Sequence, residues 1–308
     1  MSSWLPDAGT PLFILAMDHR ASFIGDVFAI ATEPTSGEVT RMRAAKSLIY
    51  AGLRQVSLPD RGRLGVLVDE RYGAPVAEAT RRDGVVLAMP IEKSGSPIFE
   101  LEYGDRFAEH VAAFDPDFVK VLVRDNPDND PDQRALQLTR LRALSDWAAA
   151  ERRRWLFELL VPPTPGQLAR SGGQESYDRD LRPALTAEVI AGFQAADVHP
   201  SIWKLEGYDT AAGAEQVLAT VAAEHDHPAG CIVLGRDAPI DRVESWLRLA
   251  APQPGYAGFA VGRTIWEQPL KDHLAGRLNA EQLNDAVART YAQLIDTYIT
   301  AQEADTSA

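Results

Sequence analysis

The chain has 308 residues, of which 45% are hydrophobic and 24% are charged. This composition is typical of a folded globular protein and excludes a disordered, collagen-like or disulfide-stapled protein. The net charge of -13 opposes contact with the phosphate backbone of nucleic acids, so we expect no nucleic-acid partner.

Short apolar runs rich in β-branched residues recur along the chain, each followed by turn residues and then by a longer stretch with helical spacing. This is the pattern of repeated βα units. Eight such runs occur, and they end near Asp18, Asp69, Met89, Val123, Val161, Leu205, Leu234 and Val261. Eight strands alternating with helices over roughly 250 residues predict a (β/α)8 TIM barrel rather than an open doubly wound sheet.

Amphipathic spacing predicts the helices between and after these runs. The clearest helix covers residues 132–150 and carries leucines on one face. Further helices are predicted at 183–196, 211–223 and 240–249, and residues 280–300 form a long C-terminal helix. Four apolar residues on that last helix either pack on their own barrel or cover a neighbouring one in a homo-oligomer. They are Tyr291, Ile295, Tyr298 and Ile299.

We expect one domain over residues 1–308, with flexible ends at 1–10 and 301–308. The first predicted strand is followed by no Gly-x-Gly-x-x-Gly, so nothing supports dinucleotide binding. Residues 162–180 are rich in Pro, Gly and polar residues, which indicates either a lid or a disordered excursion. One cysteine, no signal-like start and no membrane-length apolar run indicate a cytoplasmic protein with no membrane partner.

Charged residues interrupt four of the apolar runs. They are Asp18, Lys120, Glu158 and Lys204. In this fold the chemistry lies at the C-terminal ends of the strands, where side chains at alternate positions share a face. If these faces point inward, two amines and two carboxylates meet inside the barrel. Only five of the 31 basic residues are lysines, which makes two lysines within apolar strands notable.

These four residues have two interpretations. They form either a buried salt-bridge network without catalytic function or a site for carbonyl chemistry. In the second case Lys204 is the nucleophile and Glu158 the acid and base. A lysine nucleophile must lose its proton, and Lys120 as a neighbouring cation would favour that loss.

A second signal follows the last two predicted strands. Gly235-Arg236 and Gly262-Arg263 occur where phosphate sites are often built in this fold. Glycine lets backbone N–H groups approach an oxyanion, and arginine offers a bidentate fork. These residues predict a phosphorylated carbonyl compound, a small molecule, as the ligand.

At these residues the sequence resembles class I (Schiff-base) aldolases of the tagatose-1,6-bisphosphate aldolase type. It is most similar to the barrel domain of 2-deoxy-5-keto-D-gluconate-6-phosphate aldolase from inositol catabolism. The resemblance is carried by residues 13–20, 118–122, 157–160, 203–206 and 258–266. It implies that Lys204 forms the Schiff base, that Lys120, Glu158 and Asp18 assist, and that Arg263 binds phosphate.

The resemblance implies a lyase that cleaves 2-deoxy-5-keto-D-gluconate 6-phosphate to dihydroxyacetone phosphate and malonate semialdehyde, with no cofactor. Arg236 or Arg20 would bind the acid end of this substrate. Two alternatives remain within this class of ligand: an aldolase for another ketose phosphate, tagatose-bisphosphate-like or a sulfosugar phosphate, and a non-catalytic barrel that binds a sugar phosphate. A zinc-dependent lyase would need a cluster of His and carboxylate ligands. Of six histidines only His19 lies at a predicted strand end, so we expect no metal.

Overall fold

The computed structural model describes residues 5–58 and 62–306. Eight parallel strands form a closed barrel in which each strand pairs with the next and β8 pairs with β1. The strands are β1 Leu12–Ala16, β2 Arg63–Leu67, β3 Val86–Pro90, β4 Phe118–Arg124, β5 Trp155–Leu160, β6 Ile202–Glu206, β7 Gly230–Leu234 and β8 Tyr256–Val261. The predicted (β/α)8 barrel is therefore confirmed.

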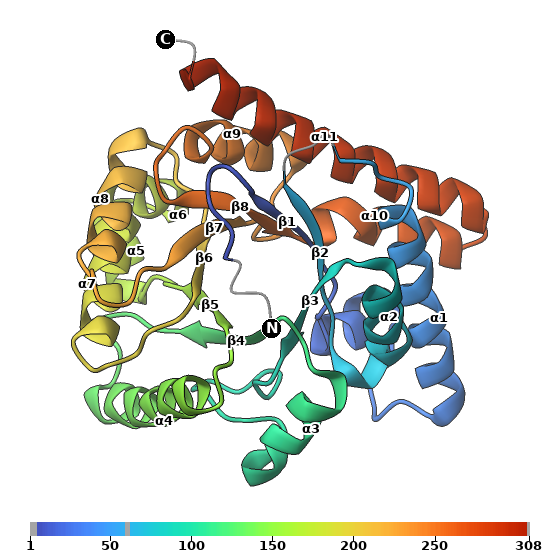
Figure 1. Ribbon diagram of the computed structural model, residues 1–308, viewed down its shortest axis with the longest axis horizontal. Helices are drawn as coiled ribbons and strands as arrows, with labels where there is room; N and C mark the ends of the chain where they lie inside the picture. The colour runs from blue at the N-terminus through green and yellow to red at the C-terminus, as the bar shows by residue number, and fades with distance from the viewer. Residues whose placement is uncertain (1–4, 59–61, 307–308) are drawn as a thin grey trace.

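Helices surround the barrel (Figure 1). The longer ones are α1 Ser36–Leu53, α2 Glu70–Asp83, α3 Phe107–Phe114, α4 Pro131–Ala150, α7 Arg182–Gln194, α8 Ala211–Ala222, α9 Ile240–Ala250, α10 Arg263–Leu274 and α11 Ala280–Thr306. Short helical turns are η1 Phe23–Val27, η2 Gly104–Arg106, α5 Pro165–Ser171, α6 Gln174–Ser176 and η3 Tyr177–Leu181. Within residues 5–58 and 62–306, no helix has the length and apolar character needed to cross a membrane.

Local sequence explains where the predicted helices begin. The side chain of Asp130 accepts hydrogen bonds from the backbone N–H groups of Asp132 and Gln133, and Pro131 occupies the first turn of α4. An aspartate cap followed by proline is a favoured start for a helix. The long C-terminal helix continues through 301–306, a part that the sequence analysis assigns to a flexible end. Of those expected ends, residues 1–4 and 307–308 lie outside the described part of the chain.

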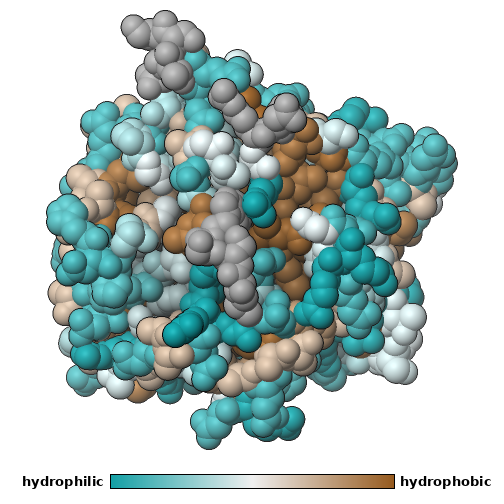
Figure 2. Space-filling view, viewed as in Figure 1, coloured by the Kyte–Doolittle hydropathy of each residue, from teal (hydrophilic) through white to brown (hydrophobic). Residues whose placement is uncertain are grey.

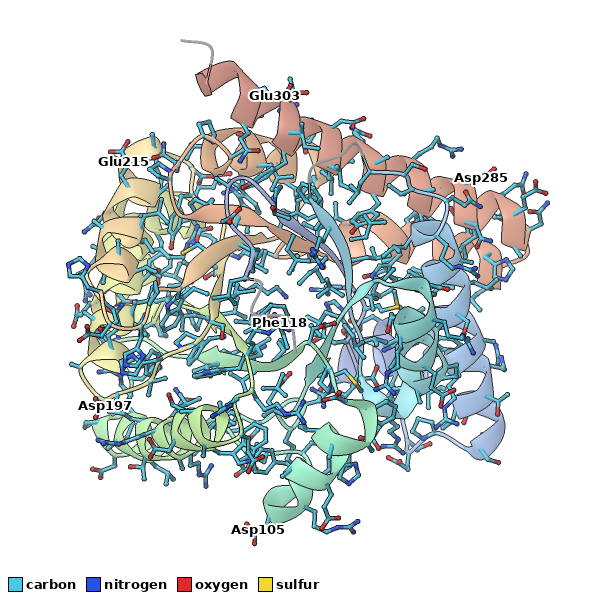
Figure 3. The ribbon with its side chains drawn as sticks, viewed as in Figure 1. Asp105, Phe118, Asp197, Glu215, Asp285 and Glu303 are labelled. Carbon is cyan, nitrogen blue, oxygen red and sulfur yellow. The ribbon has the colours of Figure 1, made fainter. Side chains whose placement is uncertain are left out.

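The barrel strands separate two apolar cores. Alternate strand residues fill the barrel interior, and Phe118, near the middle of Figure 3, is one of them. The intervening residues pack outward against the helices. Residues 5–11 cross the end at which the strands begin (Figure 1), and Leu5 packs against the interior cluster. Figure 2 shows this face, with hydrophilic side chains around the rim and a hydrophobic area between them.

The C-terminal helix α11 packs on its own barrel. Tyr291 and Tyr298 are fully buried and Ile295 nearly so, while Ile299 packs partly buried against the same core. The Tyr291 hydroxyl donates a hydrogen bond to the carbonyl of Phe13, which anchors α11 to β1. Of the two alternatives for these apolar residues, packing within the chain is the one observed.

Residues 162–180 form neither a disordered excursion nor an open lid. They fold into α5, α6 and η3, with a capping box between Thr164 and Gln167 at the first of these helices. Tyr177 is fully buried, and its hydroxyl donates to the carbonyl of Val161 at 2.8 Å. This segment is therefore docked onto the end of β5. Its Pro and Gly mark helix ends, at Pro165 and Gly172, rather than disorder.

Candidate active site

A cavity of about 400 Å³ lies at the C-terminal ends of the strands. All nine site residues predicted from the sequence line it, and they come from β4, β5 and β6 and from the segments that follow β1, β7 and β8. They are Asp18, Arg20, Lys120, Glu158, Lys204, Gly235, Arg236, Gly262 and Arg263. The cavity therefore brings together residues from distant parts of the chain, as the barrel topology predicts.

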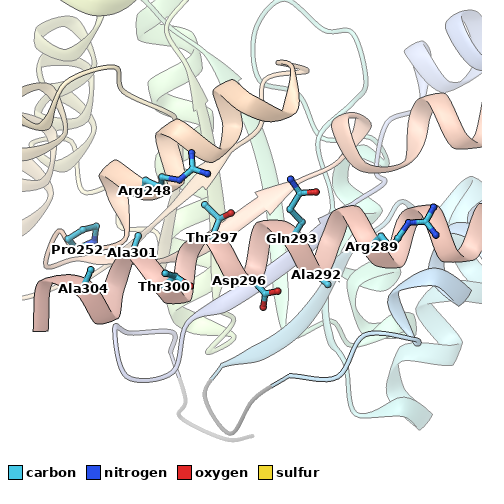
Figure 4. A pocket seen from close by; sticks show the side chains of 10 residues that line it. All are labelled: Arg248, Pro252, Arg289, Ala292, Gln293, Asp296, Thr297, Thr300, Ala301 and Ala304. Atoms are coloured by element: carbon cyan, nitrogen blue, oxygen red, sulfur yellow. The ribbon is translucent and has the colours of Figure 1, made fainter. Parts of the chain in front are cut away.

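A larger hollow of about 990 Å³ lies elsewhere, between α9 and α11 (Figure 4). It is an open groove on the outer helix layer, and its walls combine small or uncharged side chains with Arg248, Arg289 and Asp296. Ligand sites in this fold lie at the carboxyl ends of the strands. The smaller cavity inside the barrel is therefore the candidate site.

Lys120 is the centre of the charged cluster. Its Nζ lies 2.8 Å from Oδ2 of Asp18, 3.0 Å from Oε1 of Glu92 and 2.9 Å from Oε2 of Glu158. The lysine is only 1% exposed. Burial alone would lower the pKa of Lys120, but the three carboxylates outweigh burial and raise it well above its ordinary value. Lys120 therefore remains a cation.

Lys204 reaches the same cluster through Glu158. The two residues occupy paired positions on the adjacent strands β5 and β6, and Nζ of Lys204 lies 2.8 Å from Oε1 of Glu158. Glu158 thus bridges two lysine amines. Burial alone would raise the pKa of Glu158, but Lys120 and Lys204 hold it below its usual value. Asp18 behaves in the same way: burial alone would raise its pKa, but Lys120 and Lys204 are among the groups that together outweigh burial and lower this pKa strongly.

Glu92 is a member of the cluster that the sequence analysis did not name. It is 6% exposed, and its Oε1 accepts hydrogen bonds from Lys120 and from Arg20, both at 3.0 Å. Burial raises the pKa of Glu92 despite these two cations. A signal was present in the sequence, because Glu92 is the second residue after β3 just as Asp18 is the second after β1.

Arg20 lies beside Glu92 and has two carboxylate partners. Its guanidinium contacts Glu92 at 3.0 Å and Glu102 at 3.3 Å. Arg20 thus lines the cavity as predicted, but its charge is balanced by the protein. A free anion-binding arginine at this position is not what the structure shows.

The two Gly-Arg pairs form the opposite wall. Arg236 is held by Asp178 at 2.7 Å and Glu206 at 3.1 Å, so much of its hydrogen-bonding capacity is used. Arg263, the first residue of α10, forms an ion pair with the half-exposed Asp237 at 3.0 Å. A Cβ at Gly262 would lie 2.3 Å from the carbonyl oxygen of Ala16, so only glycine allows this close approach.

Lys46 is a third buried lysine, and the sequence alone predicts no role for it. It lies on α1 and is fully buried, and its Nζ donates to the carbonyls of Met17 at 2.5 Å and His19 at 3.2 Å. It also pairs with Asp69, the residue that caps α2. Lys46 therefore holds the backbone on both sides of Asp18.

His19 contributes no metal site in the described part of the chain. Burial lowers the pKa of His19 to about 4, although the Asp18 carboxylate opposes this effect, so the ring is neutral at pH 7. Its ring packs against Trp266, whose Nε1 donates to the carbonyl of Ala16. Residues 5–58 and 62–306 hold no group of three or more His, Cys, Asp or Glu side chains that could bind a metal ion.

Comparison with known proteins identifies a family by sequence. A family model described as "Uncharacterized protein conserved in bacteria (DUF2090)" matches residues 6–302. No curated protein matches the chain. The description of the matching family names no reaction, so the chemistry must be argued from the cavity and its charged residues.

Proposed function

The chain belongs to the bacterial family DUF2090, and from its cavity we propose that it is a class I aldolase acting on a phosphorylated keto sugar through a Schiff base on Lys204. One observation carries this proposal. A 4%-exposed lysine lines a cavity and is hydrogen-bonded at 2.8 Å to a carboxylate that also contacts a second lysine. A positioned acid and base beside an amine is the arrangement that imine chemistry requires.

Glu158 carries the protons of imine formation in this proposal. It accepts a proton from the ammonium group of Lys204, and the free amine then attacks the ketone carbon of the substrate. The nitrogen of the adduct passes one proton to the former carbonyl oxygen. Glu158 then protonates that hydroxyl, which leaves as water. The product is a protonated imine, with Glu158 ionised again.

The imine prepares the carbon–carbon bond for cleavage because it draws the electron pair of that bond toward its nitrogen. Lys120 keeps a positive charge beside Glu158 and Asp18 throughout. At the wall that the two Gly-Arg pairs form, Arg263 offers a guanidinium fork, and Gly262 a backbone N–H on a residue without a side chain, which suit the phosphate group. The substrate we propose is 2-deoxy-5-keto-D-gluconate 6-phosphate, which would yield dihydroxyacetone phosphate and malonate semialdehyde.

The energetics of burial favour a catalytic interpretation over a purely structural one. Moving a charged group from water into the protein interior costs several kcal/mol per ion. A protein with well-packed apolar residues in place of a buried ion pair is often as stable as one that has the pair. Here two lysines and three carboxylates are concentrated on the wall of a cavity. Perturbed titratable groups in a cleft are typical of functional sites. A barrel that only binds a sugar phosphate would not require the buried amine of Lys204.

Covalent trapping tests the proposal. The protein is incubated with dihydroxyacetone phosphate and borohydride, and the modified residue is located by mass spectrometry of peptides. We expect the reduced adduct at Lys204, because this ketone phosphate is the half of the substrate that remains on the amine after cleavage. Other ketose phosphates, including tagatose 1,6-bisphosphate and a sulfosugar phosphate, are tested in the same assay. Absence of any adduct with all of these ketones would refute the aldolase proposal.

The substitution Glu158→Gln is expected to separate imine formation from turnover. The amide keeps the size of the side chain but cannot accept a proton, so the rate of substrate cleavage should fall by about 10²–10⁴-fold. The borohydride adduct at Lys204 should still accumulate, although more slowly. Cleavage is measured by the release of dihydroxyacetone phosphate. Equal loss of trapping and of turnover would show that Glu158 chiefly holds the site together.

A further inference from the structure

We propose that Glu92 is a second acid–base residue, which takes the proton of the substrate hydroxyl whose carbon becomes the aldehyde, while Arg20 holds the oxygen of that hydroxyl. The inference rests on the aldolase function proposed above. It adds that two carboxyl groups transfer protons at different parts of the substrate. Glu158 acts on the half that becomes the ketone, and Glu92 acts on the half that becomes the aldehyde.

Two unsatisfied polar atoms carry this inference. Oε2 of Glu92 and Nε of Arg20 are buried, and neither has a hydrogen-bond partner among residues 5–58 and 62–306. Both residues line the cavity, and they already contact each other through Oε1 of Glu92. Buried polar atoms are nearly always paired, so an unpaired acceptor beside an unpaired donor calls for a ligand. A hydroxyl group fits both atoms, because it donates one hydrogen bond and accepts another.

Glu92 has a free oxygen where Glu158 has none. The two oxygens of Glu158 are occupied by Lys204 and by Lys120. Only one oxygen of Glu92 is occupied, and it contacts Lys120 and Arg20. Glu92 is therefore connected to the amine of Lys204 through Lys120 and Glu158, rather than directly. That separation suits a group that acts on a different carbon of the same substrate.

The electrostatic environments of the two carboxyl groups support different roles. Burial raises the pKa of Glu92, whereas the pKa of Glu158 is lowered by its two lysine neighbours. A base with a raised pKa takes a hydroxyl proton more readily at neutral pH. Titratable groups whose environments shift their pKa values in opposite directions often divide the acid and base roles of a reaction.

The proposed proton transfer balances within the site. Glu92 takes the hydroxyl proton, the O–H electron pair forms the aldehyde C=O bond, and the C–C bond pair moves to the imine nitrogen to give an enamine. Lys120 passes one of its ammonium protons to Glu158 as it takes the proton from Glu92, since it contacts both carboxyl groups, and it is again a cation when the transfer is complete. Glu158 delivers that proton to the enamine carbon, and water hydrolyses the imine to release the ketone.

The test separates the two halves of the reaction in the variant Glu92→Gln. The first assay incubates the enzyme with dihydroxyacetone phosphate alone in D₂O and measures exchange of its C–H proton by NMR, together with borohydride trapping. The second assay condenses dihydroxyacetone phosphate with malonate semialdehyde or glyceraldehyde 3-phosphate. We expect condensation to fall about 10²–10⁴-fold while exchange and trapping change little.

Glu102→Gln is the matched control. Glu102 contacts the same guanidinium but does not line the cavity, and its side chain is 31% exposed. All three activities should be retained in this variant. Arg20→Lys provides an independent second variant, because it keeps the positive charge but lacks Nε. Its condensation rate should fall by about tenfold or more with exchange retained.

The possible failures are distinguishable. A wild-type enzyme that neither forms the adduct nor exchanges the proton refutes the aldolase function itself. If exchange and trapping are normal but no aldehyde condenses, the assignment of Glu92 is overturned. It is also overturned if Glu92→Gln condenses at the wild-type rate, or if it loses exchange and trapping as strongly as condensation, because Glu92 would then only maintain the structure.

Discussion

Replacing Lys204 with methionine is expected to abolish the borohydride adduct and to lower turnover by at least about 10⁴-fold, because it removes the amine that forms the imine while Lys120 is held as a cation by its three carboxylates. Methionine has nearly the length of lysine and suits the apolar strand β6, so the fold should persist. Trapping with dihydroxyacetone phosphate, followed by intact-mass and peptide analysis, measures the adduct. Release of the same ketone phosphate measures turnover.

Lys271→Met serves as the control for this experiment. Lys271 lies on α10, paired with Glu267 and 35% exposed in its side chain, and it does not line the cavity. Its variant should form the adduct at the wild-type rate. A mass increase that persists in Lys204→Met and maps to Lys120 would contradict the proposal, since the nucleophile would then be a different lysine of the cavity.

The second large effect concerns stability and follows from Lys120→Met. This substitution removes the cation that Asp18, Glu92 and Glu158 share, and breaking a buried ion pair in this way typically costs about 3–5 kcal/mol. We expect a loss of unfolding free energy of this order at pH 7, measured by urea denaturation. Lys271→Met should lose less than about 1 kcal/mol, because its ion pair is partly exposed.

The loss in Lys120→Met should also depend on pH. In the native protein Lys120 lowers the pKa of Asp18 and Glu158, so their contribution to stability is present above an unfolded pKa of about 4 and is lost only as pH falls through the lower folded values. Without the cation, burial raises the pKa values of these two carboxyl groups. At lower pH they are protonated, and the free-energy cost of burying a carboxylate charge is then removed. The deficit should therefore be smaller at pH 5 than at pH 8. An equal loss of unfolding free energy at pH 5 and at pH 8 would show that the buried carboxylates do not cause the loss.

The barrel could be predicted because its signal is periodic and repeated. Each strand is a short apolar run that ends in turn residues, and all eight predicted ends lie close to the observed ones. The segment 162–180 was predicted less well. Its helices depend on the capping of Thr164 and the burial of Tyr177 against Val161, and such tertiary contacts have no periodic signature.

Part of the site followed from strand geometry alone. Alternate positions on β4, β5 and β6 point inward, so Lys120, Glu158 and Lys204 were predicted to share the barrel interior, and they do. Glu92 follows a strand rather than interrupting it, and its burial depends on Arg20 and Lys120 from other segments. Lys46 lies on a helix, where a lysine usually faces solvent, and only the folded chain reveals its buried partners.

The contacts of Lys46 with the backbone around Asp18 matter for any attempt to transfer this site to another protein scaffold. A designer who grafts the strand-end residues alone would leave out α1, and with it the ammonium group that grips the carbonyls before and after Asp18. The grafted aspartate would then sit on a looser loop, and small errors in its placement are costly in a reacting geometry. A graft that is to keep Asp18 in place therefore needs α1 with Lys46, and Asp69, in addition to the residues at the strand ends.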